Sequence, residues 1–282
     1  MAQAVPVRRR PVRWNIPLTY GLALAIIGVA VGPVLYVVLG GFRSNGQLAA
    51  RPAALPSPWI FSNYQRVLSS SSFWHQVFNS ALTALATTAG VVALGVMAAF
   101  VLSRIDFKGR EALYTFFTLG LLLPLGVAIL PLYLMLRNLG LLGTLFGLII
   151  PQVAFQLPVT IVILRPFLRA IPVEIEDSAA IDGCSRTGFF LRILLPLSGP
   201  ALVTVGVIAF VASWNAYLLP LLVLSDPATF TLPLGVQAFS TQYSQDTAAV
   251  LAFTSLAMLP ALAFFTLAER WLVGGLQGAV KG

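Results

Sequence analysis

The sequence has little charge. Of its 282 residues, 9% are Asp, Glu, Lys or Arg, compared with about 25% in soluble domains. Because 58% of the residues are hydrophobic, a water-soluble fold of this chain would expose too much apolar surface to stay dispersed. The composition therefore predicts an integral membrane protein whose main solvent is lipid.

Lysine, histidine and cysteine are scarce too, which excludes several kinds of site. Neither lysine, Lys108 or Lys281, stands in a G-x-x-x-x-G-K context, so the chain has no Walker A motif and we do not expect it to be an ATPase. The only histidine, His75, and the only cysteine, Cys184, leave no set of metal ligands, no internal disulfide and no Ser-His-Asp triad. We expect both to be structural residues, and we expect no metal, no cofactor and no catalytic residue in this chain.

The net charge of +8 does not indicate a nucleic-acid-binding protein. The 17 basic residues stand singly or in small groups between apolar stretches, and they make no continuous stripe of the kind that phosphate binding needs. A membrane-topology signal explains them better.

Long intervals without charge predict the membrane spans. A helix needs roughly 20 apolar residues to cross the hydrocarbon core, and strands of a barrel would alternate over about 10 residues. We therefore predict an all-α polytopic fold with six transmembrane helices, including a retained first helix rather than a signal peptide. The intervals are 14–42, 67–103, 112–136, 138–164, 193–225 and 247–268.

The distribution of Lys and Arg predicts the orientation. Thirteen of them lie in the N-terminal segment, the loops 104–111 and 165–192, and the C-terminal segment. The other side has four, and the 226–246 loop has none. Both termini are therefore expected on the cytoplasmic side.

The six intervals contain no Asp, Glu, Lys or Arg. Because ion-coupled carriers usually need buried ionisable groups, this pattern argues against a secondary transporter. The polar groups within the spans are neutral and suit a hydroxylated solute. We expect the translocation pathway to include Asn79, Gln152, Gln156, Trp214, Asn215 and Tyr217.

The segment 171–200 is too polar to span the membrane and too patterned for a loose linker. Pro172 begins it, and acidic residues follow in what would be the first turn of a helix, where they complement the helix dipole. Asp182-Gly183 predicts a stop or turn, after which an apolar face resumes. A short helix, a glycine turn and a second helix would form a compact knob suited to a cleft on a cytoplasmic partner.

This segment resembles the EAA loop of type I ABC importer permeases. The family pattern is approximately E-A-A-x-x-D-G-A, followed by an apolar segment that ends in I-x-L-P. The matching residues are Asp177-Ser178-Ala179, Asp182-Gly183-Cys184 and Ile193-Leu194-Leu195-Pro196. Asp177 is one methylene shorter than the motif's Glu and has Glu176 beside it, so which acid contacts the partner is left open.

Other segments are similar to those of the maltose-permease-like subunit of carbohydrate importers. They are Phe78-Asn79-Ser80, Leu164-Arg165-Pro166-Phe167, Ser213-Trp214-Asn215-Ala216-Tyr217, Thr231-Leu232-Pro233-Leu234-Gly235 and Gly278-Ala279-Val280-Lys281-Gly282. The predicted organisation is a cytoplasmic tail (1–15), a first helix (16–42), an external connection (43–72, extended over 44–58), a permease core (73–271) with the coupling loop 171–192, and a cytoplasmic tail (272–282).

The resemblance implies a partner set and a mechanism in a prokaryotic inner membrane. A second homologous permease subunit would complete the pore, two ATP-binding subunits would bind ATP and Mg²⁺, and an extracytoplasmic solute-binding protein would deliver the solute. Coupling to the ATPase would involve Glu176, Asp177, Ser178, Ala179, Ala180, Asp182 and Gly183. The binding protein would contact Gln237, Phe239, Gln242 and Tyr243.

Two alternatives remain open at the level of sequence. The same architecture could import a polyol, a glycerol-phosphate or another small solute, although the spans lack the basic residues that a phosphorylated solute would recruit. A self-sufficient secondary carrier or channel would need neither the 171–196 loop nor a partner. A membrane-embedded enzyme lacks catalytic groups in this sequence.

Overall fold

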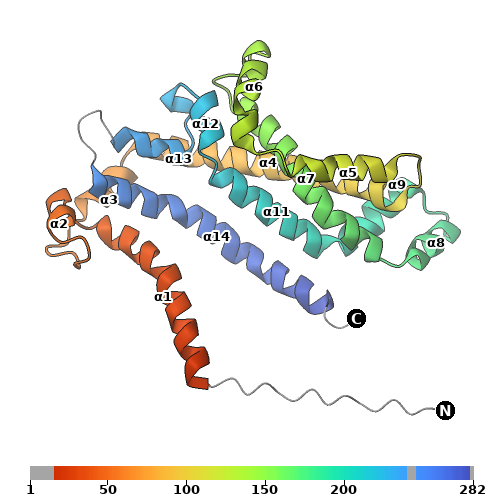
Figure 1. Ribbon diagram of the computed structural model, residues 1–282, viewed down its shortest axis with the longest axis horizontal. Helices are drawn as coiled ribbons and strands as arrows, with labels where there is room; N and C mark the ends of the chain where they lie inside the picture. The colour runs from red at the N-terminus through yellow and green to blue at the C-terminus, as the bar shows by residue number, and fades with distance from the viewer. Residues whose placement is uncertain (1–15, 240–245, 280–282) are drawn as a thin grey trace. The chain divides into compact units, whose positions relative to one another are not determined.

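The computed structural model describes residues 16–239 and 246–279, and these residues form helices and turns without a strand (Figure 1). Four helices are long and apolar enough to cross a membrane: α1 (Ile16–Gly40), α4 (Ser71–Arg104), α7 (Phe146–Ala170) and α14 (Thr247–Ala279). Two bent pairs of helices bring the number of crossings to six if each pair is one span. The predicted all-helical fold is confirmed.

Two of the six predicted spans are not single straight helices. In the interval 112–136, α5 (Arg110–Gly120) and α6 (Leu125–Asn138) meet at a bend of 99°. Pro124 directly precedes α6, where its fixed φ and missing N–H fit a helix start but not a helix interior.

The interval 193–225 is broken twice. The segment Arg186–Leu197, made of α9 (Arg186–Phe189), the π-helical turn η1 (Phe190–Leu194) and α10 (Leu195–Leu197), bends by 76° into α11 (Gly199–Trp214). After α11 the chain turns at 215–217 and continues as α12 (Leu218–Val223). The expectation that Asn215 and Tyr217 lie within the fifth helix was therefore wrong, because both lie in this second break.

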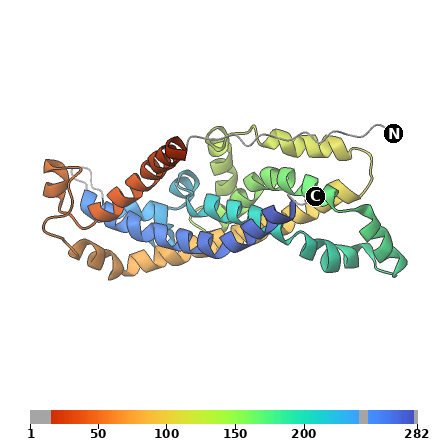
Figure 2. The same ribbon diagram turned by 90° about the horizontal axis from the view of Figure 1, so that it is seen from below.

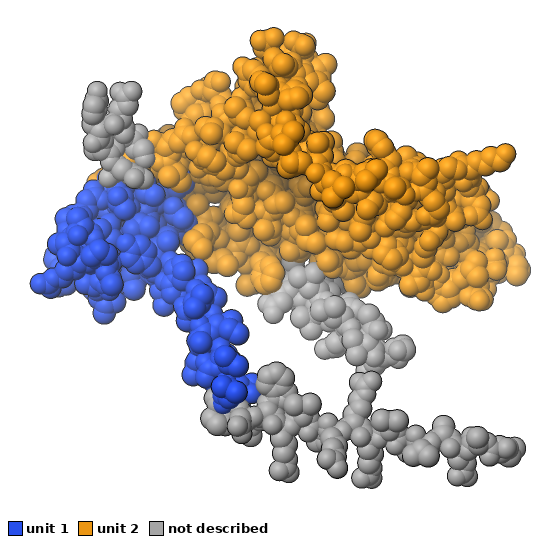
Figure 3. Space-filling view, in the orientation of Figure 1, with its two compact units in different colours: residues 1–64, 246–255 blue, residues 65–245, 256–282 orange. Residues whose placement is uncertain are grey.

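The chain forms two compact units, shown in different colours in Figure 3, which we describe separately. Unit 1 comprises residues 1–64 and 246–255, and it is organised around a buried arginine. Arg43 is 2% exposed, and its guanidinium donates to the carbonyls of Gln47, Arg51 and Pro52. These bonds fold the segment that follows α1 back on itself.

The expectation that 44–58 is extended was wrong at its start. Ser44 begins a helix, α2 (Asn45–Ala50), through a capping box in which its hydroxyl accepts from the amide of Gln47 and the Gln47 side chain accepts from the amide of Ser44. Burial raises the pKa of the Tyr64 hydroxyl, and this hydroxyl donates to the carbonyl of Val38 at 2.7 Å.

Unit 2 comprises residues 65–245 and 256–282, and its centre is the packing of α4, α7 and α11. Val91, Val153 and Ala209, one from each helix, are buried against one another. A Cβ at Gly95 would lie 2.4 Å from Thr160 Cγ2, so a small residue is needed where α4 meets α7.

The two ends of unit 2 differ. In Figures 1 and 2, α8 (Val173–Ile181) lies at one end, next to the last turns of α4 and α7. At the other end, η2 (Pro227–Thr229) and α13 (Leu232–Gly235) pack on the beginning of α4, and η3 (Val236–Phe239) follows α13. The predicted coupling loop and the predicted external segment therefore lie at opposite ends of this unit.

Candidate functional site

The segment after α7 folds as a helix, a turn and a second helix. Acidic side chains stand in the first turn of α8, and the helix ends at Ile181. Gly183 follows with a φ of +77°, a conformation that glycine adopts without steric cost. Ser185 then caps α9 by accepting a hydrogen bond from the amide of Gly188. The predicted helix–turn–helix knob is confirmed.

The knob is seated on unit 2 by one face of α8. Ala179 is 6% exposed and belongs to an apolar cluster with Leu168, Phe189 and Leu194. Among the predicted coupling residues, Ala179 is thus turned inward. The side chains of Asp177, Ser178, Ala180 and Asp182 are exposed, as is the neighbouring Ile181 at 86%.

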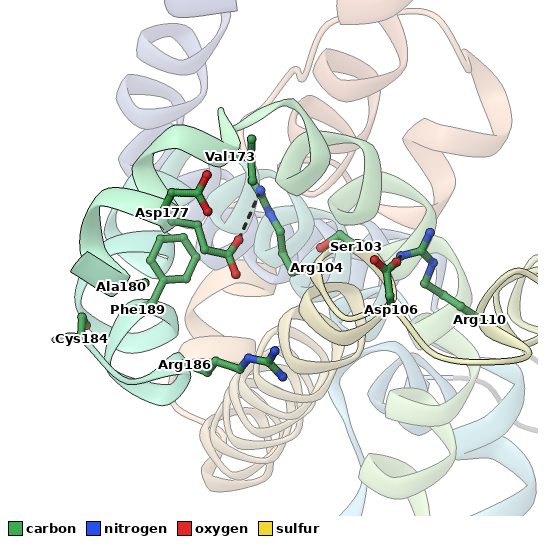
Figure 4. Close-up of a pocket in the computed structure, with 11 residues that line it drawn as sticks. Ser103, Arg104, Asp106, Arg110, Val173, Asp177, Ala180, Cys184, Arg186 and Phe189 are labelled. Atoms are coloured by element: carbon green, nitrogen blue, oxygen red, sulfur yellow. Dashed lines mark hydrogen bonds and ion pairs between the residues drawn. The ribbon is translucent and has the colours of Figure 1, made fainter. Parts of the chain in front are cut away.

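Arg104, the last residue of α4, fixes the start of the knob. Its Nη2 donates to the carbonyls of Leu168 at 2.7 Å and Ile171 at 2.5 Å, and its Nη1 lies 3.5 Å from the carboxylate of Glu176 (Figure 4). The Arg104 side chain is 7% exposed, whereas that of Glu176 is 28% exposed. Arg104, Glu176 and Asp177 all line a pocket of about 390 Å³ between the end of α4 and the knob.

A second arginine makes the reciprocal contact. Arg165, in the last two turns of α7, donates from Nε to the carbonyl of Leu102 in the last turn of α4 at 3.0 Å. Its guanidinium also pairs with Glu111 and lies 3.9 Å from the centre of the Tyr114 ring. Each arginine therefore satisfies carbonyls at the C-terminal end of the other's helix.

From the sequence, both arginines indicate a cytoplasmic position and Arg165 belongs to a segment similar to those of carbohydrate importers, but neither was predicted to cap a helix. Their position in the last turns of long apolar helices was a signal for C-terminal capping, because cations are stabilised there. Which carbonyl each arginine reaches depends on how α4 packs against α7, and spacing along the chain does not specify that packing.

Three of the predicted pathway residues come together. Gln152, Gln156 and Tyr217 line one pocket of about 260 Å³ between α7 and the break at 215–217. Gln152 Oε1 accepts a hydrogen bond from the Ser213 hydroxyl. This bond holds the end of α11 on the side of α7 that faces the pocket.

The other three predicted pathway residues make structural bonds. Asn79 donates from Nδ2 to the carbonyls of Ala228 at 2.9 Å and Phe230 at 3.0 Å, and so holds the segment around η2 against α4. Trp214 is 4% exposed and donates to a carbonyl of α14, and Asn215 donates to the carbonyl of Val211 in the preceding helix, α11. None of the three lines the pocket.

Two of the predicted binding-protein contacts are described. Gln237 and Phe239 lie in η3, and Gln237 donates from Nε2 to the Tyr217 hydroxyl at 3.2 Å. Gln242 and Tyr243 lie outside the described residues.

Comparison with known proteins identifies the family. Residues 91–277 match the family described as the binding-protein-dependent transport system inner membrane component. The chain is 31% identical to the diacetylchitobiose uptake system permease protein NgcG of Streptomyces coelicolor, covering 94% of this chain and 88% of the relative. It is also 31% identical to the trehalose transport system permease protein SugB of Mycobacterium tuberculosis, covering 97% and 99%.

A solved structure agrees on the fold. One chain of a bacterial ABC transporter involved in import of the acidic polysaccharide alginate superposes with a TM-score of 0.77 at 21% identity, covering 93% of this chain and 99% of that one. The protein is a multi-pass membrane protein with the fold of an ABC importer permease. The chain therefore belongs to the family of binding-protein-dependent transport system inner membrane components.

Proposed function

We propose that this chain forms half of the translocation pore of an ATP-driven importer for a carbohydrate. Two relatives that match almost the whole chain are named for diacetylchitobiose and trehalose, both neutral sugars. The neutral amides of Gln152 and Gln156 in the pocket beside α7 suit hydroxyl groups and would not trap a charge. The chain itself performs no catalysis.

The observation that carries the energy coupling is the knob formed by α8, the Gly183 turn and α9. Its outer face combines exposed acidic side chains with the apolar Ile181, which suits docking into a cleft on an ATPase subunit. Two such ATPases would hold ATP and Mg²⁺, one docking on this chain and the other on the second permease subunit. An external binding protein would deliver the sugar toward η3.

The contacts of the two acids favour Asp177 as the ATPase contact. Glu176 is engaged by Arg104 inside the chain, while Asp177 stands exposed on the next position of α8. Asp177 also occupies the motif's acidic position.

Co-purification tests this proposal. The tagged chain should co-elute with an ATPase subunit, and Asp177→Ala should reduce the recovered ATPase more than Glu176→Ala does. The removed carboxylate would otherwise form a charge-assisted contact worth about 1.5–3 kcal/mol.

Two results would contradict the proposal. Solute flux by this chain alone would support a self-sufficient carrier. A larger loss with Glu176→Ala would mean that Glu176, not Asp177, contacts the ATPase.

A further inference from the structure

One pocket of unit 2 contains two side-chain amides, and in each of them one buried atom lacks a hydrogen-bond partner among the described residues. Gln152 is 8% exposed, and its Oε1 is bonded to Ser213, but its Nε2 has no partner within residues 16–239 and 246–279. The Oε1 of Gln156 is buried and also unpaired in that part of the chain. Because a buried unpaired polar group costs free energy, the working protein is expected to supply a partner.

The two unpaired atoms are complementary in kind. Gln152 and Gln156 are four residues apart on α7, so they share one face of the helix, and both line the same pocket. Nε2 of Gln152 is a donor, and Oε1 of Gln156 is an acceptor. A single hydroxyl group between them can accept from the first and donate to the second.

The rest of the pocket fits a neutral ring. Its wall includes Phe155, Tyr217 and several aliphatic side chains, and none of its ten lining residues is charged. Apolar and aromatic walls with a few placed polar groups are typical of small-molecule sites. The volume of about 260 Å³ is slightly below the range of about 300–1,000 Å³ for complete ligands, which suits one ring of a larger solute.

We propose that this pocket is a solute subsite in which Gln152 and Gln156 together bind one hydroxyl of a neutral carbohydrate during its passage. The inference rests on the proposed carbohydrate import and adds to it a specificity-determining pair within this subunit. The Tyr217 ring forms part of the wall, and its hydroxyl is held by Gln237 of η3, so the pocket is connected to the segment proposed to face the binding protein.

The test uses the complete transporter in proteoliposomes with its binding protein. Uptake is first measured for neutral mono- and disaccharides, including trehalose and diacetylchitobiose, and then for monodeoxy derivatives of an imported sugar. Gln156→Met removes the acceptor, and Gln152→Met removes the donor. The measured quantity is the ratio of sugar uptake to uptake of its deoxy derivative. For one hydroxyl position, this ratio should be about five- to tenfold lower in each variant than in the wild type, which is the effect expected for one hydrogen bond.

The same binding protein delivers the sugar to every variant, so its own preference between the sugar and the deoxy derivative contributes equally to all measurements. A difference in preference between variants therefore arises in the permease. Gln65→Met is the matched control, since Gln65 is exposed and lies outside the pocket. Gln152→Met also removes the bonds that Gln152 Oε1 accepts from the hydroxyls of Ser213 and Thr87. Gln156→Met is therefore the primary variant, because the Oε1 that it removes has no partner among the described residues.

Three outcomes overturn the inference. Unchanged discrimination at every hydroxyl by a transporting Gln156→Met variant means that the amides do not contact the solute. Loss of the second permease subunit from the purified variant means that the amides bind that subunit instead. If the wild-type transporter imports none of the sugars, the carbohydrate proposal fails, and this inference fails with it.

Discussion

At the scale of single residues, Gly183 has a role that space alone does not explain. A Cβ at this position would meet no heavy atom within 4 Å, yet the φ of +77° lies in the left-handed region. A side chain there is disfavoured by backbone strain and not by packing. The turn between α8 and α9 therefore requires a residue that tolerates this conformation.

Gly183→Val is expected to uncouple ATP hydrolysis from uptake and leave membrane insertion intact. A β-branched residue in the left-handed region costs about 1–2 kcal/mol, which lowers the population of the native turn about 5- to 30-fold. Uptake and ATPase activity of the purified transporter should be measured together. Gly183→Asn is the matched control, because Asn tolerates this region, and it should retain most of the coupling. Normal uptake by Gly183→Val would remove the turn from the coupling route.

At the scale of helices, Arg104 connects three helices through its side-chain contacts. It belongs to α4, donates to two carbonyls at the end of α7, and pairs with Glu176 on α8. We therefore expect a shift of α4 along its length to move the knob as well. Arg165 makes the converse connection from α7 to α4.

Arg104→Gln is expected to loosen the knob and lower both thermal stability and the ratio of uptake to ATP hydrolysis. Each hydrogen bond that the charged, nearly buried guanidinium makes contributes about 1.5–3 kcal/mol to stability, and the substitution removes this contribution. Arg110→Gln is the control from the same loop, because Arg110 pairs with the 94% exposed Asp106 and such surface pairs contribute about 0–1 kcal/mol. Equal effects of the two substitutions would show that Arg104 acts only as a surface charge.

The same scale shows what could be predicted from the sequence. The knob at 171–189 was predictable, because its acids, its glycine and its apolar residues each act locally. The bend of 99° before α6 was not, since Pro124 indicates a helix boundary but not the angle, which depends on the packing of α6 with α12. Likewise, Asn79 is polar within an apolar span, but only the fold reveals that its amide holds the carbonyls near η2.

At the scale of the whole molecule, the two loops that are rich in basic residues lie at one end of unit 2. The contacts of Arg104 with α8 and of Arg165 with Glu111 bring the loops 104–111 and 165–192 together. The segment 226–239, which has no Lys or Arg, lies at the opposite end of the unit, where η2 and α13 pack on α4. Since Lys and Arg favour the cytoplasmic side, we expect the knob and both termini to be cytoplasmic.

Cys184 allows this orientation to be measured on the unmodified chain. It is the only cysteine in the sequence and lies partly exposed in the turn after α8. A membrane-impermeant maleimide should leave it unlabelled in intact cells and label it in inverted vesicles, with detergent-solubilised protein showing full reactivity. Moving the cysteine to the exposed Ser225, as Cys184→Ser with Ser225→Cys, should reverse the pattern. Labelling of Cys184 from outside would place the knob on the external face, where no ATPase could reach it.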